Sequence, residues 1–298
     1  MFATYSYLRQ HNGNQPILDY KEYYKIFSNS REFGGEFTNV DHLVKNRFMD
    51  AFGYVYNAVL RKNPRNVLDI GCGNGVNLPI SRILPEIDFH GLDYAEKALI
   101  SAKAAYPNVT FHVEDAFNMS FPPETFDLAI LSGVLILYRE EKDRLNLLAE
   151  IHRILAENGV LVLIVWNESP LLKASIQLSR VLGRCFNQQL PEDFMGLHFK
   201  PREILHMARK SGFQVEEQIH TAHYYGILES VRYLNFNRYN RIFGKAESEA
   251  GREHSQNILR DLQQQAGKWS SLTWVLYALS RINHRWFSMF SVYHLRKA

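Results

Sequence analysis

The sequence has few of the features that mark a secreted or membrane-spanning protein. Among its 298 residues are only two cysteines, Cys72 and Cys185, which are too few for a disulfide framework and do not have the spacing of a metal site. The longest uninterrupted apolar run is Val160–Trp166, far shorter than the roughly 20 residues that cross a bilayer. Residues 1–12 lack the apolar stretch and small-residue cleavage site of a signal peptide. These absences predict a protein of the reducing cytoplasm.

The chain also lacks a large excess of either sign of charge, since its formal net charge is only +3. The charge is nevertheless uneven, because residues 225–298 hold eleven Lys and Arg, five Asp and Glu, and twelve aromatic residues. This composition favours a helical subdomain with a solvated basic face. Contact with a membrane surface, an acidic ligand or nucleic acid is the alternative, and no nucleic-acid motif supports the last of these.

The middle of the chain alternates apolar strand patterns with helix patterns. The predicted strands are residues 66–71, 87–92, 109–114, 126–132, 160–166 and 213–220, with a last strand at 287–295. The predicted helices are residues 77–84, 95–106, 139–156 and 201–211. In the third helix, Leu145, Leu148, Ile151 and Leu155 fall on one face. Such an alternating series predicts a parallel sheet that is covered by helices on both faces.

Two segments lie outside this alternation, and they suggest three parts of the chain. Residues 1–62 have helical and aromatic character, and we expect them to form an N-terminal cap. Residues 63–224 together with 287–298 are expected to form the core. Residues 225–286 carry apolar residues three or four positions apart, as on one helix face, and are expected to be a helical insert over the substrate side.

The most informative segment is Val67–Gly75, which reads V-L-D-I-G-C-G-N-G. A buried strand runs here into a turn with glycine at every second position. Glycine permits positive φ angles and lets a ligand approach bare backbone. A helix start is expected to follow, with its free N–H groups facing the ligand. The segment therefore predicts a loop that binds a nucleotide-type cofactor.

Three acids occur at or just beyond the ends of the first three predicted strands. Asp69 lies at the first, Asp93 at the second, and Asp115 just past the third. Ligands of open parallel sheets bind at the carboxyl ends of the strands. Asp93 follows Gly71 by 22 residues, a spacing that suits an acceptor for ribose hydroxyls. Taken singly, Asp69 could only brace the loop, Asp93 could only cap the next helix, and Asp115 could be an ordinary loop acid.

Five segments, taken in order, resemble the motifs of class I S-adenosylmethionine-dependent methyltransferases. They are Val67–Gly75, Phe89–Asp93, Glu114–Ala116, Phe126–Val134 and Arg153–Leu161. The resemblance implies a Rossmann-like α/β fold with a seven-stranded, mostly parallel sheet and helices on both faces. It also implies S-adenosyl-L-methionine as cofactor and S-adenosyl-L-homocysteine as product. The residues implied in cofactor binding are Asp69, Gly71, Cys72, Gly73, Gly75, Asp93, Tyr94, Asp115, Ala116 and Ser132.

A dinucleotide is the rival cofactor, and the loop does not match it well. Dinucleotide loops read G-x-G-x-x-G and do not carry an acid two residues before the first glycine. Here the glycines are Gly71, Gly73 and Gly75, Val76 takes the place of the third glycine, and Asp69 precedes them. Three acids suit a sulfonium amino acid with a ribose better than a ligand rich in phosphate.

The methyl group of a sulfonium is already activated, so the protein mainly aligns the acceptor, excludes water and, for some acceptors, removes a proton. Tyr138 lies where related enzymes often have histidine. The best candidate for a general base is therefore His198, followed by His223. The tyrosines at positions 20, 23 and 24 are candidates for part of a lid near the cofactor, with packing onto the core as the alternative. Arg47 is a candidate partner for the cofactor's carboxylate, with a solvated helix residue as the alternative.

The leading hypothesis is methyl transfer to a small molecule, at oxygen rather than nitrogen or carbon. A lipid-soluble acceptor such as a quinone precursor is the second hypothesis, with peripheral membrane contact through residues 269–290. A cofactor-binding subunit that acts through a partner is the third. A homodimer surface in the aromatic insert also stays open.

Overall fold

The structure is a computed structural model that describes residues 53–174, 177–178, 197–221, 283–288 and 290–298. The described residues belong to two compact units. The larger holds residues 53–167, 197–221 and 290–298, and the smaller holds residues 168–174, 177–178 and 283–288. The predicted sheet lies entirely in the larger unit, and it provides the frame for the site.

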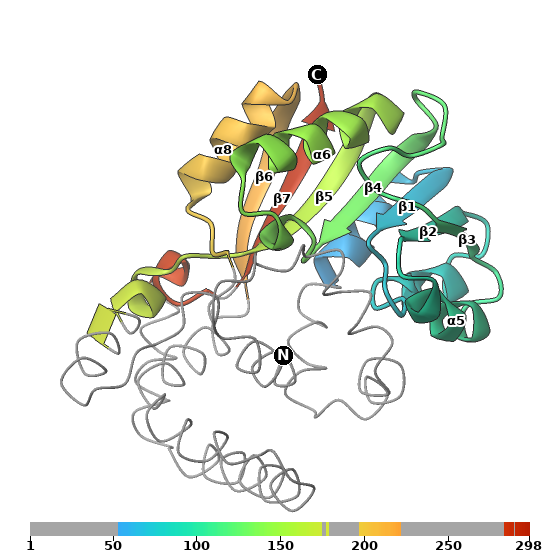
Figure 1. Cartoon of the computed structure of the whole chain (residues 1–298), viewed down its shortest axis with the longest axis horizontal. Coiled ribbons are helices and arrows are strands. Elements are labelled where there is room, and N and C mark those ends of the chain that lie inside the picture. The colour runs from blue at the N-terminus through green and yellow to red at the C-terminus, as the bar shows by residue number, and fades with distance from the viewer. Residues whose placement is uncertain (1–52, 175–176, 179–196, 222–282, 289) are drawn as a thin grey trace, which may run out of the picture. The chain divides into compact units, whose positions relative to one another are not determined.

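Seven strands form one sheet in the order β3-β2-β1-β4-β5-β7-β6 (Figure 1). Neighbouring strands are parallel, except that β7 runs antiparallel to both β5 and β6. This arrangement confirms the predicted seven-stranded, mostly parallel sheet. The strands are β1 (Asn66–Ile70), β2 (Asp88–Asp93), β3 (Thr110–Val113), β4 (Phe126–Ser132), β5 (Leu155–Trp166), β6 (Phe213–Thr221) and β7 (Phe290–Lys297).

Helices cover both faces of the sheet, as predicted. In Figure 1, α6 (Glu141–Ile154) and α8 (Pro201–Lys210) lie on the near face. The helix at residues 53–62 lies on the far face. Side-chain alternation in β7 explains this, because Tyr293 and Leu295 join the core under α6 and α8, whereas His294 between them points the other way and meets Arg61. Helix α5 (Glu96–Ala105) connects β2 to β3.

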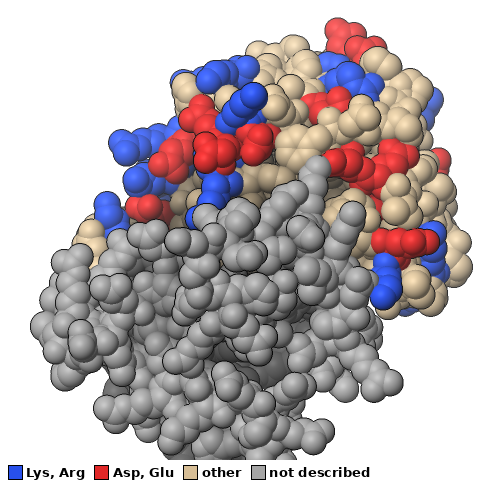
Figure 2. All heavy atoms as spheres, in the orientation of Figure 1, with Lys and Arg blue, Asp and Glu red and all other residues tan. Residues whose placement is uncertain are grey.

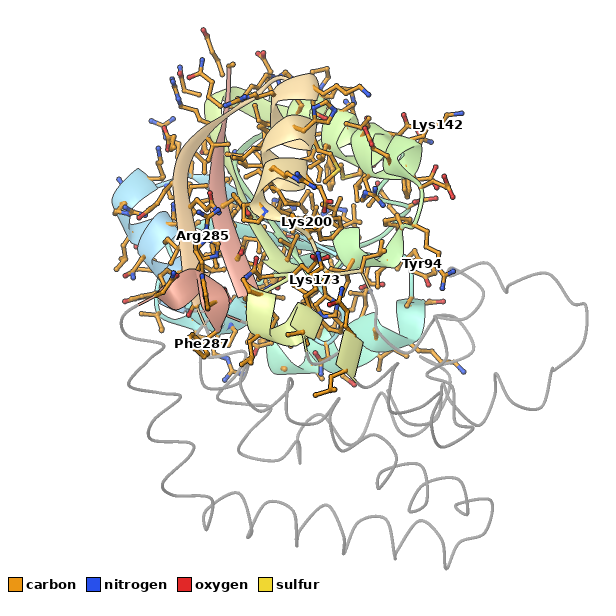
Figure 3. All side chains as sticks on the ribbon, turned by 90° about the vertical axis from the view of Figure 1, so that its left-hand side faces the viewer. Tyr94, Lys142, Lys173, Lys200, Arg285 and Phe287 are labelled. Carbon is orange, nitrogen blue, oxygen red and sulfur yellow. The ribbon has the colours of Figure 1, made fainter. Side chains whose placement is uncertain are left out.

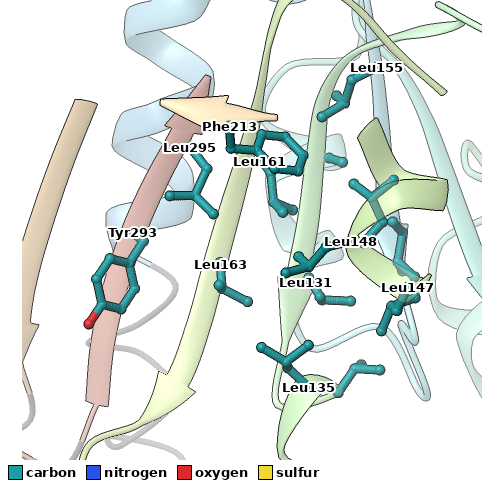
Figure 4. Close-up of a cluster of buried hydrophobic side chains, with 14 of the residues drawn as sticks. Leu131, Leu135, Leu147, Leu148, Leu155, Leu161, Leu163, Phe213, Tyr293 and Leu295 are labelled. Carbon is teal, nitrogen blue, oxygen red and sulfur yellow. The ribbon is translucent and has the colours of Figure 1, made fainter. Parts of the chain in front are cut away.

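The core between the sheet and α6 is made mainly of leucine and isoleucine (Figure 4). Leu147, Leu148, Ile151 and Ile154 of α6 are buried, at positions that repeat with the helical period. Each such side chain contributes about 1.5–3 kcal/mol relative to full exposure. In β5, the residues from Val160 to Val165 are all buried, as expected for a central strand that is covered on both sides.

The predicted α-helix at residues 77–84 is wrong in type. The structure has a short 3-10 helix, η2 (Leu78–Arg82), with Pro79 in its first turn. Proline has no N–H and five residues do not complete two α-helical turns. No long helix therefore begins directly after the glycine loop, and the loop's own backbone must carry whatever binding role the helix start was expected to have.

The boundary between α6 and β5 also differs from the prediction. The helix ends at Ile154 rather than 156, and the strand begins at Leu155, which pairs with Phe126. The pairing register shifts before Leu128 pairs with Val160, and Asn158 has a φ of 63°. An irregular stretch of strand therefore replaces the expected helix end. The last strand begins at Phe290 rather than 287, since η5 (His284–Trp286) comes just before it.

Several expectations fall outside the described residues. They include the tyrosines at positions 20, 23 and 24, Arg47, His223, and nearly all of the N-terminal cap and the insert at 225–286. Within the described part of the chain, none of the helices is long and apolar enough to cross a membrane. On the surface seen in Figure 2, the basic and acidic side chains of the described residues are interspersed.

Candidate cofactor site

The sheet brings the predicted acids to one edge. Strands β1 and β2 are in register, with Asp69 paired to Gly91 and Ile70 to Leu92. On the other side of β1, Ile70 pairs with Leu131 of β4. The carboxyl ends of these strands therefore meet, and the segments that follow them converge on the region where open parallel sheets bind ligands.

The glycine loop is fastened to the end of β2 by its backbone. The N–H groups of Gly71 and Cys72 both donate to the carbonyl oxygen of Leu92, at 2.7 and 3.0 Å. The N–H of Gly75 donates to the Cys72 carbonyl at 2.8 Å. Gly71, Gly73 and Gly75 have φ angles of 68°, 53° and 87°, in the left-handed region that other residues rarely adopt. The glycine spacing seen in the sequence is therefore a backbone requirement.

The glycines meet this requirement in two kinds of surroundings. A Cβ on Gly71 would collide with Val134, and one on Gly75 would come within 2.7 Å of the Tyr106 ring. Among the residues that the structure describes, a Cβ on Gly73 or on Gly133, which follows β4, would meet nothing within 4 Å. Gly71 and Gly75 thus allow close packing, whereas at Gly73 and Gly133 the backbone borders open space that a ligand can use.

Asp93 connects the glycine loop to the end of β2. Its carboxylate accepts the N–H of Gly73 at 2.8 Å and that of Ala95 at 2.9 Å, and only 3% of the residue is exposed. Burial raises the pKa of Asp93, while the N–H groups of Ala95, Gly73 and Tyr94 oppose the rise. Asp93 therefore holds the glycine loop and the residue that precedes α5, although it does not cap the helix itself. Each carboxylate oxygen keeps acceptor capacity for a hydroxyl.

Asp69 is also buried, but its carboxylate accepts longer hydrogen bonds than that of Asp93. It is 1% exposed, and the side-chain amide of Asn77 donates to its two oxygens at 3.2 and 3.4 Å. Burial raises the pKa of Asp69 to about 7, with Asn77 opposing the rise and Asp93 adding to it. Asn77 is a site residue that the sequence reasoning missed. Its only signal was an amide between the apolar residues Val76 and Leu78.

Cys72 and Tyr94 are two further residues that the resemblance implied in cofactor binding. Cys72 is 4% exposed, and burial together with Asp69 and Asp93 raises the pKa of its thiol. This thiol is therefore a neutral packing group, beside Gly91 of β2. Tyr94 directly follows β2 and is half-buried (labelled in Figure 3).

The segment after β3 reaches the same edge. Val113 pairs with Asp93, and the N–H of Glu114 donates to the Asp93 carbonyl at 3.3 Å. Asp115 follows, and its carboxylate accepts the N–H of Phe117 at 3.1 Å. This local turn fixes the backbone at Ala116, which is half-buried and packs against the core.

The segment after β4 completes the edge. Ser132 is half-buried at the end of the strand, and the N–H of Gly133 donates to the Ile164 carbonyl at 3.1 Å. Beyond η3 (Leu135–Leu137), the Tyr138 ring contacts Phe117 edge-on, with centroids 4.9 Å apart. The segments after β3 and β4, far apart in the sequence, therefore pack together, although sequence reasoning gave Phe117 no role.

His198 lies at a different part of this edge. Its ring is 5.4 Å from that of Trp166, the last residue of β5, and the N–H of the next residue, Phe199, donates to the Trp166 carbonyl at 2.8 Å. In the sheet order, β4 separates β5 from β1. The structure thus brings Asp69, Asp93 and the glycine loop together, and places His198 farther along the edge, at the end of β5.

The residues fit the expected cofactor. Open backbone at Gly73 and Gly133 leaves room against the loop, and two buried carboxyls offer hydrogen-bond acceptors and negative charge. A ligand with hydroxyls and a cationic end matches this donor and acceptor set better than a pyrophosphate would. The fold and the site thus have the Rossmann-like arrangement that the resemblance to class I S-adenosylmethionine-dependent methyltransferases implied.

Comparison with known proteins supports this class. Residues 67–159 match a family model described as a methyltransferase domain, so the chain contains such a domain. A demethylmenaquinone methyltransferase of Thermotoga maritima is 33% identical over 112 residues, which are 37% of this chain and 47% of that protein. A tRNA (carboxymethyluridine(34)-5-O)-methyltransferase of Saccharomyces cerevisiae is 27% identical over 99 residues, 33% of this chain and 34% of that protein. The chain thus spans about half or less of these curated relatives.

A solved structure resembles the fold over a longer stretch. The magnesium protoporphyrin IX methyltransferase of Synechocystis PCC 6803, crystallised with bound SAH, has a TM-score of 0.51 and 18% identity. The comparison covers 68% of this chain and 94% of that chain. At this identity the likeness establishes the fold. The three proteins act on different kinds of acceptor, so the acceptor has to be argued from this chain's own residues.

Proposed function

We propose that the protein transfers a methyl group from S-adenosylmethionine to a small-molecule acceptor, at oxygen, by in-line displacement. The observation that carries the proposal is the pair of buried carboxyls, Asp69 and Asp93, beside a glycine loop that is open at Gly73. In this proposal Asp93 accepts the ribose hydroxyls, Asp69 faces the amino end of the cofactor, and Asp115 accepts from the adenine amine. Gly71, Cys72, Gly73, Gly75, Tyr94, Ala116 and Ser132 line the rest of the site.

The cofactor supplies an activated methyl group, and the chain's residues have to orient the reactants and exclude water. We place the acceptor along the ends of β4 and β5, beside Tyr138 and Trp166. His198 lies against Trp166 and is the candidate general base for an acceptor hydroxyl. Residues 1–62 are proposed as a cap on this side, residues 63–224 and 287–298 as the core, and residues 225–286 as a cover.

A lipid-soluble acceptor, such as a quinone precursor, is the second candidate. The likeness to a demethylmenaquinone methyltransferase over 112 residues favours it, as does the aromatic and basic composition of residues 225–298. An aromatic, basic surface suits an acceptor that partitions into a membrane interface. The two candidates differ in whether the acceptor is taken from water or from a bilayer.

The first experiment is calorimetric titration of the full chain with S-adenosylmethionine. We expect binding that Asp93→Ala weakens by about tenfold or more, because a hydrogen-bonded carboxylate acceptor is lost. Unchanged affinity in that variant would exclude the ribose role. Since Asp93 also holds Gly73, Asp93→Asn serves as the matched variant that keeps the side-chain shape and one of the two acceptor oxygens, and thermal unfolding of both variants reports on the loop.

The second experiment identifies the acceptor with methyl-labelled cofactor. Water-soluble hydroxylated compounds are assayed beside quinone precursors held in phospholipid vesicles. Label on the soluble compounds supports the first candidate, and label only on vesicle-borne compounds supports the second. His198→Ala is expected to lower turnover by about 100-fold, the usual range for general acid–base catalysis, while cofactor affinity stays unchanged. Full turnover in His198→Ala would exclude His198 as the base.

A further inference from the structure

We propose that Asn77 is a positioning residue that holds the Asp69 carboxyl for the ammonium end of the cofactor, and that cofactor binding displaces a proton from this carboxyl. The inference rests on the proposed function. It goes further by assigning a role to Asn77 and by coupling cofactor binding to pH.

The geometry separates the two buried acids of the site. Asp93 accepts backbone hydrogen bonds from Gly73 at 2.8 Å and from Ala95 at 2.9 Å. Asp69 receives the amide of Asn77, which is shared between its two oxygens at 3.2 and 3.4 Å. Short bonds to an ionised carboxylate stabilise the charge more than long ones do. The surroundings of Asp93 therefore favour a negative charge more than those of Asp69, and Asp69 is the acid that more readily holds a proton.

The groups around Asp69 also favour its protonated form. Its described titratable neighbours are Asp93 at the end of β2 and the Cys72 thiol in the loop. Neither supplies positive charge, and burial raises the pKa of Asp69 to about 7. Asn77 is itself only 7% exposed, so its amide is a fixed neighbour that cannot be replaced by water. An incoming ammonium group would supply the missing positive charge and favour the ionised form.

The Asn77 side chain is placed by the turn that made the predicted α-helix fail. The N–H of Leu78 donates to the carbonyl of Gly75 at 3.1 Å, and η2 starts directly after Asn77. This tight turn brings residue 77 back over β1, eight positions after Asp69. Asn77 is the residue before η2, yet its side chain makes no cap hydrogen bond there. Its amide is directed to Asp69 instead.

The test is calorimetric titration of the full chain at pH 6 and pH 7 in buffers of different ionisation enthalpy. The probes are S-adenosylmethionine, S-adenosylhomocysteine, which keeps the amino-acid end, and methylthioadenosine, which lacks it. The pH is kept below about 8, where α-amino groups titrate. We expect the first two to release close to one proton at pH 6 and about half a proton at pH 7, and methylthioadenosine to release none.

Three variants sharpen the test. Asp69→Asn should abolish proton release and weaken S-adenosylmethionine by about tenfold or more, with methylthioadenosine unchanged within about twofold. Asn77→Leu removes the amide that lowers the pKa of Asp69, so proton release should persist to higher pH. Ser81→Ala is the matched control, because it removes a buried hydroxyl four residues after Asn77, which donates to the Leu78 carbonyl at 2.8 Å. It should leave proton release as in the wild type.

The outcomes separate the two levels of the proposal. S-adenosylmethionine binding without proton release at pH 6 overturns this inference alone. Equal release with methylthioadenosine, or undiminished release in Asp69→Asn, overturns it as well. An absence of any S-adenosylmethionine binding overturns the proposed function itself. The comparison of the three ligands on the wild-type protein decides whether cofactor binding releases a proton from Asp69, even if Asn77→Leu does not fold.

Discussion

The two halves of the sheet, one around β1 and β2 and the other around β5 and β7, bury different kinds of side chain. At the carboxyl ends of β1 and β2, buried side chains are acidic, and the backbone is open at Gly73. In β5 and β7, most buried side chains are apolar, with Ser291 and His294 of β7 as polar exceptions, and Tyr293 is fully buried. Charged groups there form ion pairs at the surface, such as Arg61 with Glu217 at 2.6 Å.

The two kinds of buried side chain have opposite effects on the free energy of unfolding. Burying a carboxyl such as Asp69 without a cation opposes folding, and a ligand that supplies the cation recovers that free energy. Burying Tyr293 stabilises the fold directly. The β1–β2 half is therefore expected to respond to ligand and pH, and the β5–β7 half to control stability.

Gly73→Arg should have the largest effect on the first half. The side chain would enter the open space beside the loop, so we expect S-adenosylmethionine affinity to fall by at least about 100-fold, equivalent to roughly 3 kcal/mol. Calorimetric titration measures this loss. Gly73→Asn is the matched control for backbone strain, because asparagine tolerates the positive φ of 53°. Wild-type affinity in Gly73→Arg would show that the cofactor does not lie against this loop.

Tyr293→Ala should have the largest effect on the second half. The ring is fully buried in the core under α6 and α8, and losing an aromatic side chain from a core costs about 3–5 kcal/mol. Urea unfolding measures the free energy of unfolding. Tyr293→Phe, which removes only the hydroxyl that accepts from Gln218 at 3.3 Å, should cost about 1 kcal/mol. A lower cofactor affinity in folded Tyr293→Phe would contradict the separation of the halves.

Asp69→Asn should change how stability depends on pH in the cofactor-free protein. The folded pKa of about 7 lies above the ordinary 3.8, so the folded state binds more protons than the unfolded state between these values. Stability from this group is therefore present below about pH 4 and is lost as the pH rises to about 7. The total loss is on the order of 4 kcal/mol. Thermal unfolding at pH 5 and pH 8 should show a smaller difference in Asp69→Asn, and an equal difference would contradict the raised pKa.

Glu217→Gln should have the smallest effect. Its partner Arg61 is 56% exposed, and solvent screens such pairs, so we expect a loss within about 1 kcal/mol that shrinks further in high salt. Urea unfolding at low and high salt measures it. A loss of several kcal/mol would mean that the pair, together with the buried His294 at 3.0 Å from Glu217, acts as more than a surface contact.

Much of the fold could be predicted from local pattern. The strand at Phe126–Ser132 was predicted with the bounds it has, because a run of apolar residues between turns needs no distant information. The type of the segment after the loop was wrong, since apolar spacing around residue 80 suited an α-helix while Pro79 and the adjacent turn produced a 3-10 helix. The end of α6 was wrong because pairing of Leu155 with Phe126 extends the strand into the expected helix end.

The sequence by itself determined the glycine spacing, the order of strands and helices, and the acids at the strand ends, because these follow from backbone requirements over a few residues. Only the tertiary structure decided that β7 lies between β5 and β6, that Gly71 serves packing while Gly73 borders open space, and that Asn77 pairs with Asp69. The physical reason is that burial, open space and the pKa of a carboxyl depend on neighbours brought from other strands. Chain spacing alone does not specify those neighbours.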